Sequence, residues 1–418
     1  MTASNLSDRF LFGRSQVLRQ VVGSKVGLTL LVGDSGIGKS EILGHAQTTT
    51  ETMLAPPPVE VFSRDGAIVE AVCESLALAL AFAATEPGHE AQLRLVREYI
   101  QELAKRSGSF VAQVAKEALL HQLTLRLGDR VVELGKNLAA EIVKSGDGLL
   151  AARVGDFRSA DVMSELASLA SEVRDLSGRE VLSIAVDRLE ILPEADVRLL
   201  ADVAPRLPEG IVIKAALLDT TSAGAAALQL VRQVAGDAVA VISVEPLGEL
   251  TVREILEASE LDPAAAPDVL RLTGGYPLHI GDLVRHIATG GQVNRATTND
   301  DFGQLIKARW DGLPLECRQV ARQLCVLERP LPTDSLIATL GIQVAAWWDI
   351  VETLRTERIL TQTVDGLPWF HEQRRRWLVD RLPDEERRAT ASRMLPAVCE
   401  VALGASGWRY CTTLSALI

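Results

Sequence analysis

The segment LTLLVGDSGIGKS, residues 28–40, combines residue types that could bind a phosphate group. Gly33, Gly38, Lys39 and Ser40 fit the spacing G-x-x-x-x-G-K-[ST] of a phosphate-binding loop. Glycines let backbone N–H groups turn toward phosphate oxygens, and a helix that starts at the loop adds positive potential. We expect the lysine to reach the β and γ phosphates and the serine to ligate Mg²⁺. The predicted phosphate-contacting residues are Gly33, Asp34, Ser35, Gly36, Ile37, Gly38, Lys39, Ser40 and Glu41.

A second candidate site is the acidic end of the segment VLSIAVDRLEIL, residues 181–192. An apolar strand that ends in Asp187 places a carboxylate at the edge of a parallel sheet, where ligands bind. There we expect Asp187 to hold Mg²⁺ or its water. Many motor ATPases have a glutamate next, but here Arg188 follows, and Glu190 is the nearest acid that could orient water. This predicts slow hydrolysis, which is atypical of motors.

The surrounding sequence predicts the elements that would position these residues. Short apolar segments at 26–32, 181–187, 211–218 and 239–247 read as buried strands. Segments of helical periodicity lie between them, and this alternation is typical of a parallel sheet covered by helices on both faces. We therefore predict an α/β fold, a phosphate-loop NTPase domain at residues 1–246 with a helical insertion at about 88–150.

The chain changes character after Pro246. Four helical segments at 247–312 predict a small helical lid domain. Residues 313–382 contain three helical segments and then two short strands around Asp365–Gly366, a strong hairpin-turn signal. Three helices followed by a hairpin predict a winged-helix domain, and residues 383–418 form a further helical segment.

Composition limits the remaining possibilities. The 418 residues carry a formal net charge of -12, which argues against a dedicated nucleic-acid surface. The five cysteines show no zinc spacing, so we expect buried free thiols. The longest apolar run, residues 76–84, is far below the roughly 18 residues that span a bilayer, and the N-terminus has no signal peptide. These features predict a cytoplasmic protein.

The order of several segments resembles that of the STAND ATPases, the signal-transduction ATPases that include NB-ARC and NACHT proteins and the ATP-binding halves of large bacterial transcription regulators. The spacing of Asp187 and Glu190 is more similar to NACHT proteins. The resemblance covers roughly residues 1–400 and is carried by LFGRSQVL, GDSGIGKS, IAVDRLE, EPLGELTVREI, TGGYPLHI and WFHEQRRRWL.

The resemblance implies further nucleotide contacts. Phe12, Gly13 and Arg14 correspond to a box that lies near the adenine in STAND proteins. The GGYP stretch resembles the G-x-P element, which implies that Gly275 and Pro277 lie at the base. His371 corresponds to the histidine that contacts the ADP β-phosphate. Because sensor repeats usually follow the winged helix in this family, residues 383–418 are expected to begin a sensor region.

The sequence also departs from the family pattern. Asp219 and Thr220 occupy the region where many members have a sensor arginine after a strand, so γ-phosphate sensing there is not implied. The run of arginines at 374–376 could contact DNA, but the acidic run at 384–386 favours a solvated basic face.

Together these features indicate a nucleotide-operated switch. ADP, bound by Lys39, Ser40, Pro277 and His371, is expected to stabilise a closed state, and ATP to favour self-association under the control of a signalling protein or ligand. One alternative is an AAA+ ATPase of the origin-recognition kind, which binds DNA through its winged helix. Another is a scaffold that binds nucleotide without turnover.

Overall fold

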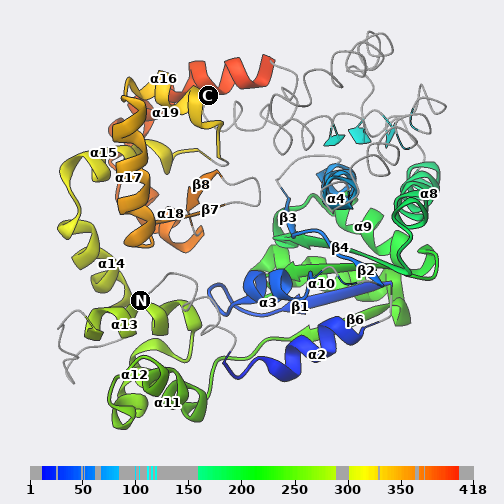
Figure 1. Cartoon of the computed structure of the whole chain (residues 1–418), viewed down its shortest axis with the longest axis horizontal. Coiled ribbons are helices and arrows are strands. Elements are labelled where there is room, and N and C mark those ends of the chain that lie inside the picture. Colours follow the sequence, from blue (N-terminus) through cyan, green and yellow to red (C-terminus); the bar gives the residue numbers. More distant parts are fainter. Residues whose placement is uncertain are drawn as a thin grey trace. The chain divides into compact units, whose positions relative to one another are not determined.

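The fold is described from a computed structural model, in which residues 1–245 and 246–418 form two compact units. Figure 1 shows the elements of both units. The described residues are 12–24, 27–48, 50, 52–61, 67–83, 99, 103, 111–112, 114–115, 118–119, 159–288, 301–327, 330–362, 367–370 and 372–403. Most of the predicted helical insertion at 88–150 lies outside these residues.

A parallel sheet forms the centre of the first unit (Figure 1). Every strand pair in it is parallel, as the alternation of apolar strands and helices predicted. The strand β5 lies between the strand that precedes the phosphate loop, β1, and the strand that carries Asp187, β4. The order is β2 (Met53–Leu54), β4 (Val181–Asp187), β5 (Ile211–Leu217), β1 (Leu28–Val32) and β6 (Val239–Ser243), and β3 (Val59–Glu60) also pairs with β4.

Proline explains why the edge next to β4 consists of two short strands. β2 pairs with the start of β4 and β3 pairs with its end. Residues 56–58 between them are all proline, which lacks the N–H donor that a strand ladder needs. The prolines therefore separate the two short strands, and the second ends beside Asp187.

Helices cover both faces of the sheet. Lys214 points to the face covered by α3, where its Nζ reaches the carbonyl oxygen of Ala46. On the other face Ile184 and Ile213 line one apolar pocket with side chains of α4, α8 and α9. The helices of the first unit are α2 (Ser15–Gly23), α3 (Lys39–His45), α4 (Ala67–Ala83), α8 (Ser159–Ser177), α9 (Glu194–Val203) and α10 (Ser222–Ala235), with 3-10 turns at Leu189–Ile191, Ala204–Arg206 and Gly236–Ala238.

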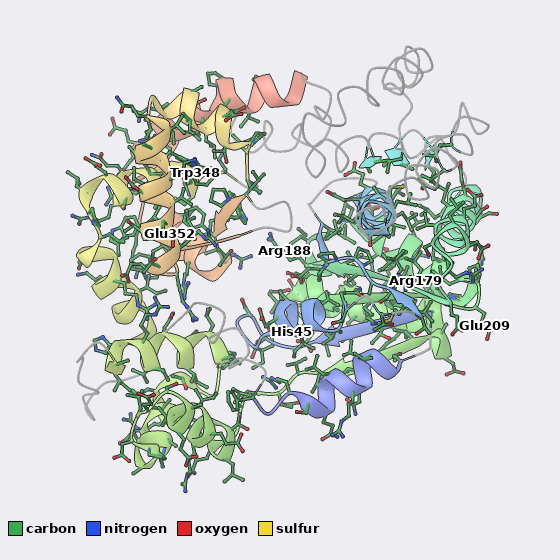
Figure 2. The ribbon with its side chains drawn as sticks, viewed as in Figure 1. His45, Arg179, Arg188, Glu209, Trp348 and Glu352 are labelled. Carbon is green, nitrogen blue, oxygen red and sulfur yellow. The ribbon has the colours of Figure 1, made fainter. Side chains whose placement is uncertain are left out.

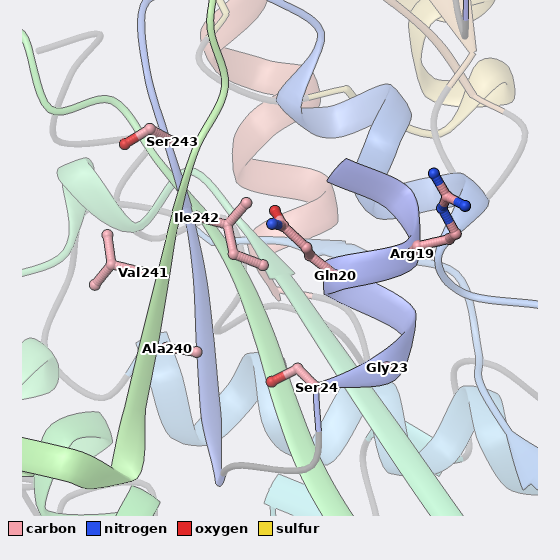
Figure 3. A pocket seen from close by; sticks show the side chains of 8 residues that line it. All are labelled: Arg19, Gln20, Gly23, Ser24, Ala240, Val241, Ile242 and Ser243. Atoms are coloured by element: carbon pink, nitrogen blue, oxygen red, sulfur yellow. The ribbon is translucent and has the colours of Figure 1, made fainter. Parts of the chain in front are cut away.

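The strand β6 forms the other edge of the sheet, and α2 lies beside it (Figure 3). A pocket of about 560 Å³ lies there, lined on one side by Arg19, Gln20, Gly23 and Ser24 and on the other by residues 240–243. A short edge strand bordered by a helix is a poor template for pairing with another strand.

The second unit begins with helices only. Gly274, in the left-handed conformation, ends α12, and Pro277 is the first residue of α13. Proline is favoured at this position because its missing N–H would have no intrahelical partner there. The helices are α11 (Glu249–Ala258), α12 (Ala266–Thr273), α13 (Pro277–Ala288) and α14 (Asp301–Gly312), with a 3-10 turn at Pro263–Ala265.

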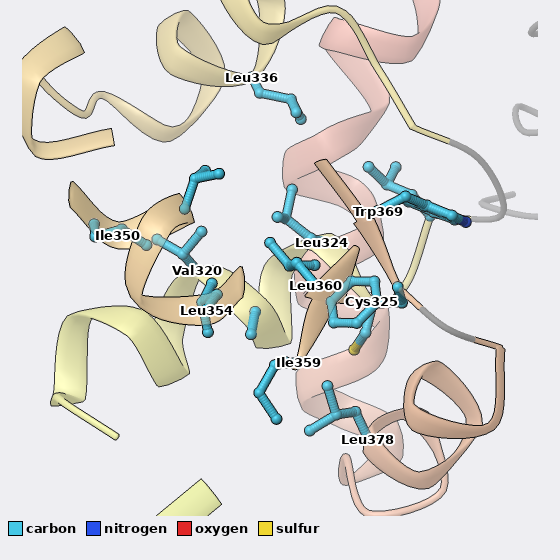
Figure 4. Packing of buried hydrophobic residues seen from close by; sticks show 14 of the residues in the cluster. Val320, Leu324, Cys325, Leu336, Ile350, Leu354, Ile359, Leu360, Trp369 and Leu378 are labelled. Carbon is cyan, nitrogen blue, oxygen red and sulfur yellow. The ribbon is translucent and has the colours of Figure 1, made fainter. Parts of the chain in front are cut away.

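The rest of the second unit contains three helices, an antiparallel strand pair and two further helices. Trp347 and Leu354 of the third helix are fully buried in its apolar core, which Figure 4 shows in part. The naming of this arrangement as a winged helix stays a prediction. The elements are α15 (Leu315–Leu324), α16 (Thr333–Leu340), α17 (Val344–Thr356), β7 (Leu360–Gln362), β8 (Pro368–Phe370), α18 (Glu372–Val379) and α19 (Asp384–Leu403).

The cysteines that the structure describes are free thiols, as the sequence predicted, and Cys411 lies outside the described residues. Cys73, Cys317 and Cys325 are free and buried, and Cys399 is partly buried. Burial raises the pKa of the Cys325 thiol to about 12, so this thiol is not reactive. Within the described parts of the chain, no helix has the length and apolarity needed to cross a membrane.

Candidate functional site

The phosphate loop lies between the end of β1 and the start of α3. Ile37 anchors it, because this side chain is buried while its loop neighbours are half-exposed. Gly33 approaches the strand after β6 so closely that a Cβ atom would lie 2.8 Å from the carbonyl oxygen of Val244. Any other residue would push the loop away from this strand. The loop is therefore held in place by its neighbours on both sides.

Lys39 folds back over its own loop. Its Nζ donates to the carbonyl oxygens of Gly33 at 2.6 Å and Asp34 at 2.7 Å. An ammonium group has three donors, so these two bonds leave one for a phosphate oxygen. Burial lowers the pKa of Lys39, whereas nearby carboxylates act in the opposite direction: Asp187, Glu190, Asp219 and Asp34. The structure thus brings the predicted lysine and acids into one electrostatic neighbourhood.

The strand order explains this neighbourhood. β4, β5 and β1 are adjacent and parallel, so Asp187, Asp219 and the phosphate loop follow strand ends at the same edge of the sheet. Asp187 is 8% exposed, and its Oδ1 accepts from the N–H of Arg188 at 2.9 Å. Its Oδ2 makes no hydrogen bond to any described residue. This oxygen is available to a cation or to water.

Arg188 and Glu190 form the turn after this strand. Arg188 has a φ of 67°, a left-handed conformation that few residues other than glycine adopt. It directs the chain into the turn Leu189–Ile191, and Figure 2 labels its position. Glu190 Oε2 accepts from the N–H of Leu218 at 3.1 Å, at the end of β5. Glu190 therefore links two strand ends, a structural role that sequence reasoning did not foresee.

Arg14 has a defined role that its position in the sequence does not reveal. The side chain is 4% exposed. Nη1 donates to the carbonyl oxygen of Glu245 at 2.6 Å, and Nη2 donates to that of Ile37 at 3.1 Å. Burial lowers the pKa of this guanidinium, and Glu245 opposes the shift. Arg14 thus connects the phosphate loop to the segment that follows β6. The adenine contacts of Phe12, Gly13 and Arg14 stay predictions.

The residues present fit a magnesium ion held together with a nucleotide. Ser40 is exposed at the second position of α3, and Asp187 has the available oxygen described above. Among the described residues no group of three or more His, Cys, Asp or Glu side chains could hold a metal. Mg²⁺ is commonly bound by one or two protein ligands plus phosphates and water, so such a group is not required. Ser40 and Asp187 remain the predicted ligands.

The predicted contacts of the second unit have structural roles of their own. Gly275 has a φ of +78°, and a Cβ atom there would lie 2.5 Å from the carbonyl oxygen of Leu247. The Leu247 N–H also donates to the carbonyl oxygen of Gly275 at 2.8 Å. Pro277 is buried at the start of α13. His371 lies outside the described residues, between Phe370 of β8 and Glu372 of α18.

The sequence predicted a solvated basic face for the arginine run 374–376. This prediction is wrong for Arg374 and Arg375. Arg374 is 3% exposed, and its Nη2 donates to both carboxylate oxygens of Asp282, at 2.8 and 2.9 Å. Arg375 donates to the carbonyl oxygens of Cys325 and Leu327. Asp282 is far away in the sequence, so the run alone gave no signal of this pairing. Of the three, Arg376 is exposed.

Comparison with solved structures identifies the fold. One match is the crystal structure of a Signal Transduction ATPase with Numerous Domains (STAND) protein with a tetratricopeptide repeat sensor from Pyrococcus horikoshii, with a TM-score of 0.57 and 13% sequence identity. The chain has the fold of a STAND ATPase. The match covers 96% of this chain and 48% of that chain, so the STAND fold described here spans about half of the solved structure.

The STAND likeness confirms the fold class, and this fold is the one that the resemblance of the ordered segments implied. At 13% identity the likeness concerns the fold alone. No model of a protein family matches the chain, and no curated protein matches it. The site residues therefore rest on their own geometry.

Proposed function

We propose that the chain is an ATP- and ADP-binding signal-transduction switch that hydrolyses ATP slowly. The observation that carries the proposal is the position of Lys39 among the acids at one edge of the sheet, with Asp187 beside it. Such an edge combines a cation for phosphates with a carboxylate for Mg²⁺. A STAND fold, which implies nucleotide binding, supports the same function.

The proposal keeps the predicted states of the switch. ADP favours a closed state and ATP favours self-association, and Pro277 and His371 contact the nucleotide. A ligand shifts such an equilibrium only through its different affinities for the two states. The signal that controls the exchange is a protein or ligand of unspecified identity. The Arg188 that follows Asp187 supports slow turnover, because it occupies the position of the catalytic glutamate in motors.

Lys39→Ala tests the phosphate loop. We expect weaker ADP binding without loss of the fold, because each charge-assisted hydrogen bond to phosphate is worth about 1.5 to 3 kcal/mol. This corresponds to a decrease of about ten- to a hundredfold in affinity. The measurement is isothermal titration with ADP and Mg²⁺, with circular dichroism to check folding.

Arg198→Ala is the matched control for Lys39→Ala. Arg198 is an exposed cation on α9 of the same unit, 3.7 Å from Glu194. We expect its removal to leave ADP affinity unchanged. Equal ADP affinity in Lys39→Ala and the wild type would contradict the proposal.

A DNA-binding AAA+ function is less well supported. α17 is the third helix of the predicted winged helix. Its exposed side chains include Val344, Trp348, Asp349, Glu352 and Arg355, and this arginine forms an ion pair with Glu352. Figure 2 labels Trp348 and Glu352 on this helix. Acidic side chains repel the phosphate backbone, whereas DNA binders usually present Lys and Arg there. A steep salt dependence of binding to a DNA duplex, measured by fluorescence anisotropy, would support the alternative.

A further inference from the structure

A second candidate site lies in a cleft of the second unit, between α14, α15 and α18. Its volume is about 120 Å³. Two indole rings form its walls, Trp310 from α14 and Trp377 from α18, with ring centroids 6.4 Å apart. Leu378 and Leu382 are buried and complete the apolar part of the lining. The cleft therefore offers an apolar surface that two aromatic rings border.

Charged side chains surround this apolar surface, and most are paired. Lys307 Nζ lies 2.8 Å from Asp311 Oδ2. Arg322 lies over the Trp310 ring and forms an ion pair with Glu386 at 3.1 Å. These two pairs cancel in charge. The net charge of the cleft is therefore set by the last cation of the lining.

Arg381 is that last cation. Its guanidinium lies 4.2 Å from the centroid of the Trp377 ring, and its Nη1 donates to the carbonyl oxygen of Trp377 at 3.3 Å. Among the described residues it has no carboxylate partner. The Nε1–H of Trp377 is buried and has no acceptor among them either. The cleft thus carries one uncompensated positive charge, that of Arg381.

We propose that this cleft binds a small organic carboxylate. Its carboxylate group pairs with the Arg381 guanidinium, a geometry that suits planar bidentate contacts. Its apolar stem lies against Trp310 and Trp377, where aromatic contacts add to burial.

Size and charge restrict the ligand class. A volume of about 120 Å³ corresponds to about four water molecules in liquid, which suits an acid with a single ring or short chain. Nucleotides need the roughly 300 to 1,000 Å³ of ordinary ligand pockets. One uncompensated guanidinium balances a carboxylate but not the two charges of a phosphate monoester. The site is therefore distinct from the phosphate loop.

Binding would join two helices that are already linked. Arg309 and Trp310 are neighbours on α14, and Arg374 and Trp377 lie one turn apart on α18. Asp282 connects the two helices through both arginines. A ligand in the cleft that contacts both Trp310 and Trp377 would add a second connection. We therefore expect the acid to stabilise the second unit against unfolding.

The test is saturation-transfer NMR on the full chain with benzoate and with its neutral isostere benzamide. Butyrate and phenylacetate extend the series of acids. We expect each acid to bind, and benzoate to bind up to about fivefold more tightly than benzamide, since an exposed ion pair is worth up to about 1 kcal/mol. All six tryptophans lie between residues 310 and 408, so their fluorescence reports unfolding of this unit, and benzoate should raise its midpoint.

Variants test whether the acid binds beside Arg381 or elsewhere on the chain. Arg381→Gln should weaken benzoate binding by up to about fivefold and leave benzamide binding unchanged. Arg388→Gln, an exposed arginine on α19, is the matched control and should change neither. Lys39→Ala should leave benzoate binding intact, so failure of the nucleotide proposal is distinguishable from failure of this one. The inference is overturned if none of the acids binds, if benzamide equals benzoate, or if Arg381→Gln binds benzoate as the wild type does.

Discussion

Lys214 in the first unit and Arg374 in the second are buried cations with different surroundings. Lys214 is 1% exposed in the centre of β5, and its Nζ donates to one carbonyl oxygen, that of Ala46 at 3.2 Å. Arg374 is as buried, but it donates to both oxygens of the Asp282 carboxylate. Arg309 of α14 donates to the same carboxylate at 2.7 Å. One cation therefore has a neutral partner and the other an anion.

The pKa shifts show what this difference means. Burial lowers the pKa of Lys214 to about 8, because no carboxylate compensates for its desolvation. Burial would raise the pKa of Asp282, but Arg374 and Arg309 outweigh it and hold the pKa below its ordinary value. An arginine stays charged at any ordinary pH, whereas a lysine can release its proton. The paired site is therefore permanently ionic, and the unpaired site can become neutral.

Removing the anion should break the paired site most strongly. We expect Asp282→Asn to destabilise the second unit by about 3 to 5 kcal/mol, since Arg374 and Arg309 would stay buried without a carboxylate. Asp311→Asn, which alters an exposed pair on α14, should cost less than about 1 kcal/mol. The measurement is urea unfolding followed by tryptophan fluorescence. Equal stability of both variants would show that the paired site contributes little.

The paired site also predicts a pH dependence with a definite sign. Because the folded-state pKa of Asp282 is lowered, the unfolded chain binds more protons in acid. The contribution is complete above the ordinary aspartate pKa and is lost as the pH falls through the folded-state value. The stability difference between the wild type and Asp282→Asn should therefore shrink in acid and stay constant at neutral pH.

Replacing the unpaired cation should have the opposite effect. Lys214→Met keeps the length of the side chain and removes the charge, so we expect the first unit to gain about 3 kcal/mol at pH 7. The gain follows from the shift of the lysine pKa from 10.5 to about 8. Since the folded state loses its proton first, the wild type gains stability between pH 8 and 10.5, and the difference should close there.

Circular dichroism during urea unfolding measures this difference, and the tryptophan transition of the second unit is the internal reference. Lys307→Met, at an exposed lysine of α14, is the control and should show no such trend. A loss of stability in Lys214→Met at every pH would mean that the bond to Ala46 outweighs desolvation. Lys214 would then be a cap of α3, and the comparison with Arg374 would fail.

Arg14 extends the comparison of Lys214 and Arg374, because it is a buried arginine whose partners are neutral carbonyl oxygens. Arg14→Ala would leave the carbonyl oxygens of Glu245 and Ile37 without this donor. We expect a loss of about 1 to 3 kcal/mol, in unfolding stability or in ADP affinity as the loop loosens. Arg19→Ala, at an exposed arginine that donates to Ser15, should change neither. Unchanged ADP affinity and stability in Arg14→Ala would remove its bracing role.

Local sequence patterns predicted part of the candidate functional site. They missed the surroundings of the buried cations for a physical reason. The phosphate loop and Asp187 follow from short motifs, because the chemistry and the backbone conformation are set within a few residues. The partner of Arg374 lies on another helix, 92 residues away in the sequence, and a run of arginines by itself is more typical of a solvated face. Lys214 was read as one residue of an apolar strand. Only packing shows that its side chain has no route to water.

The predicted winged helix shows the same limit. The apolar period identified the three helices, since core positions recur within each of them, and the Asp365–Gly366 turn signal identified the strand pair. The sequence did not indicate that Arg375 of α18 would donate to carbonyl oxygens at the end of α15. Such bonds depend on the crossing of elements, which local periodicity does not specify.

Glu190→Gln should have the smallest effect on stability and tests chemistry most directly. A glutamine oxygen can still accept from the Leu218 N–H, so we expect a change below about 1 kcal/mol in the free energy of unfolding. If the charged carboxylate also orients water, phosphate release should fall about tenfold or more while ATP binding is kept. Glu194→Gln, an exposed acid on α9, should alter neither quantity. A phosphate assay and an ATP titration on the same preparations separate the two roles. Unchanged phosphate release would leave Glu190 as the link between β4 and β5 and would exclude it as the base.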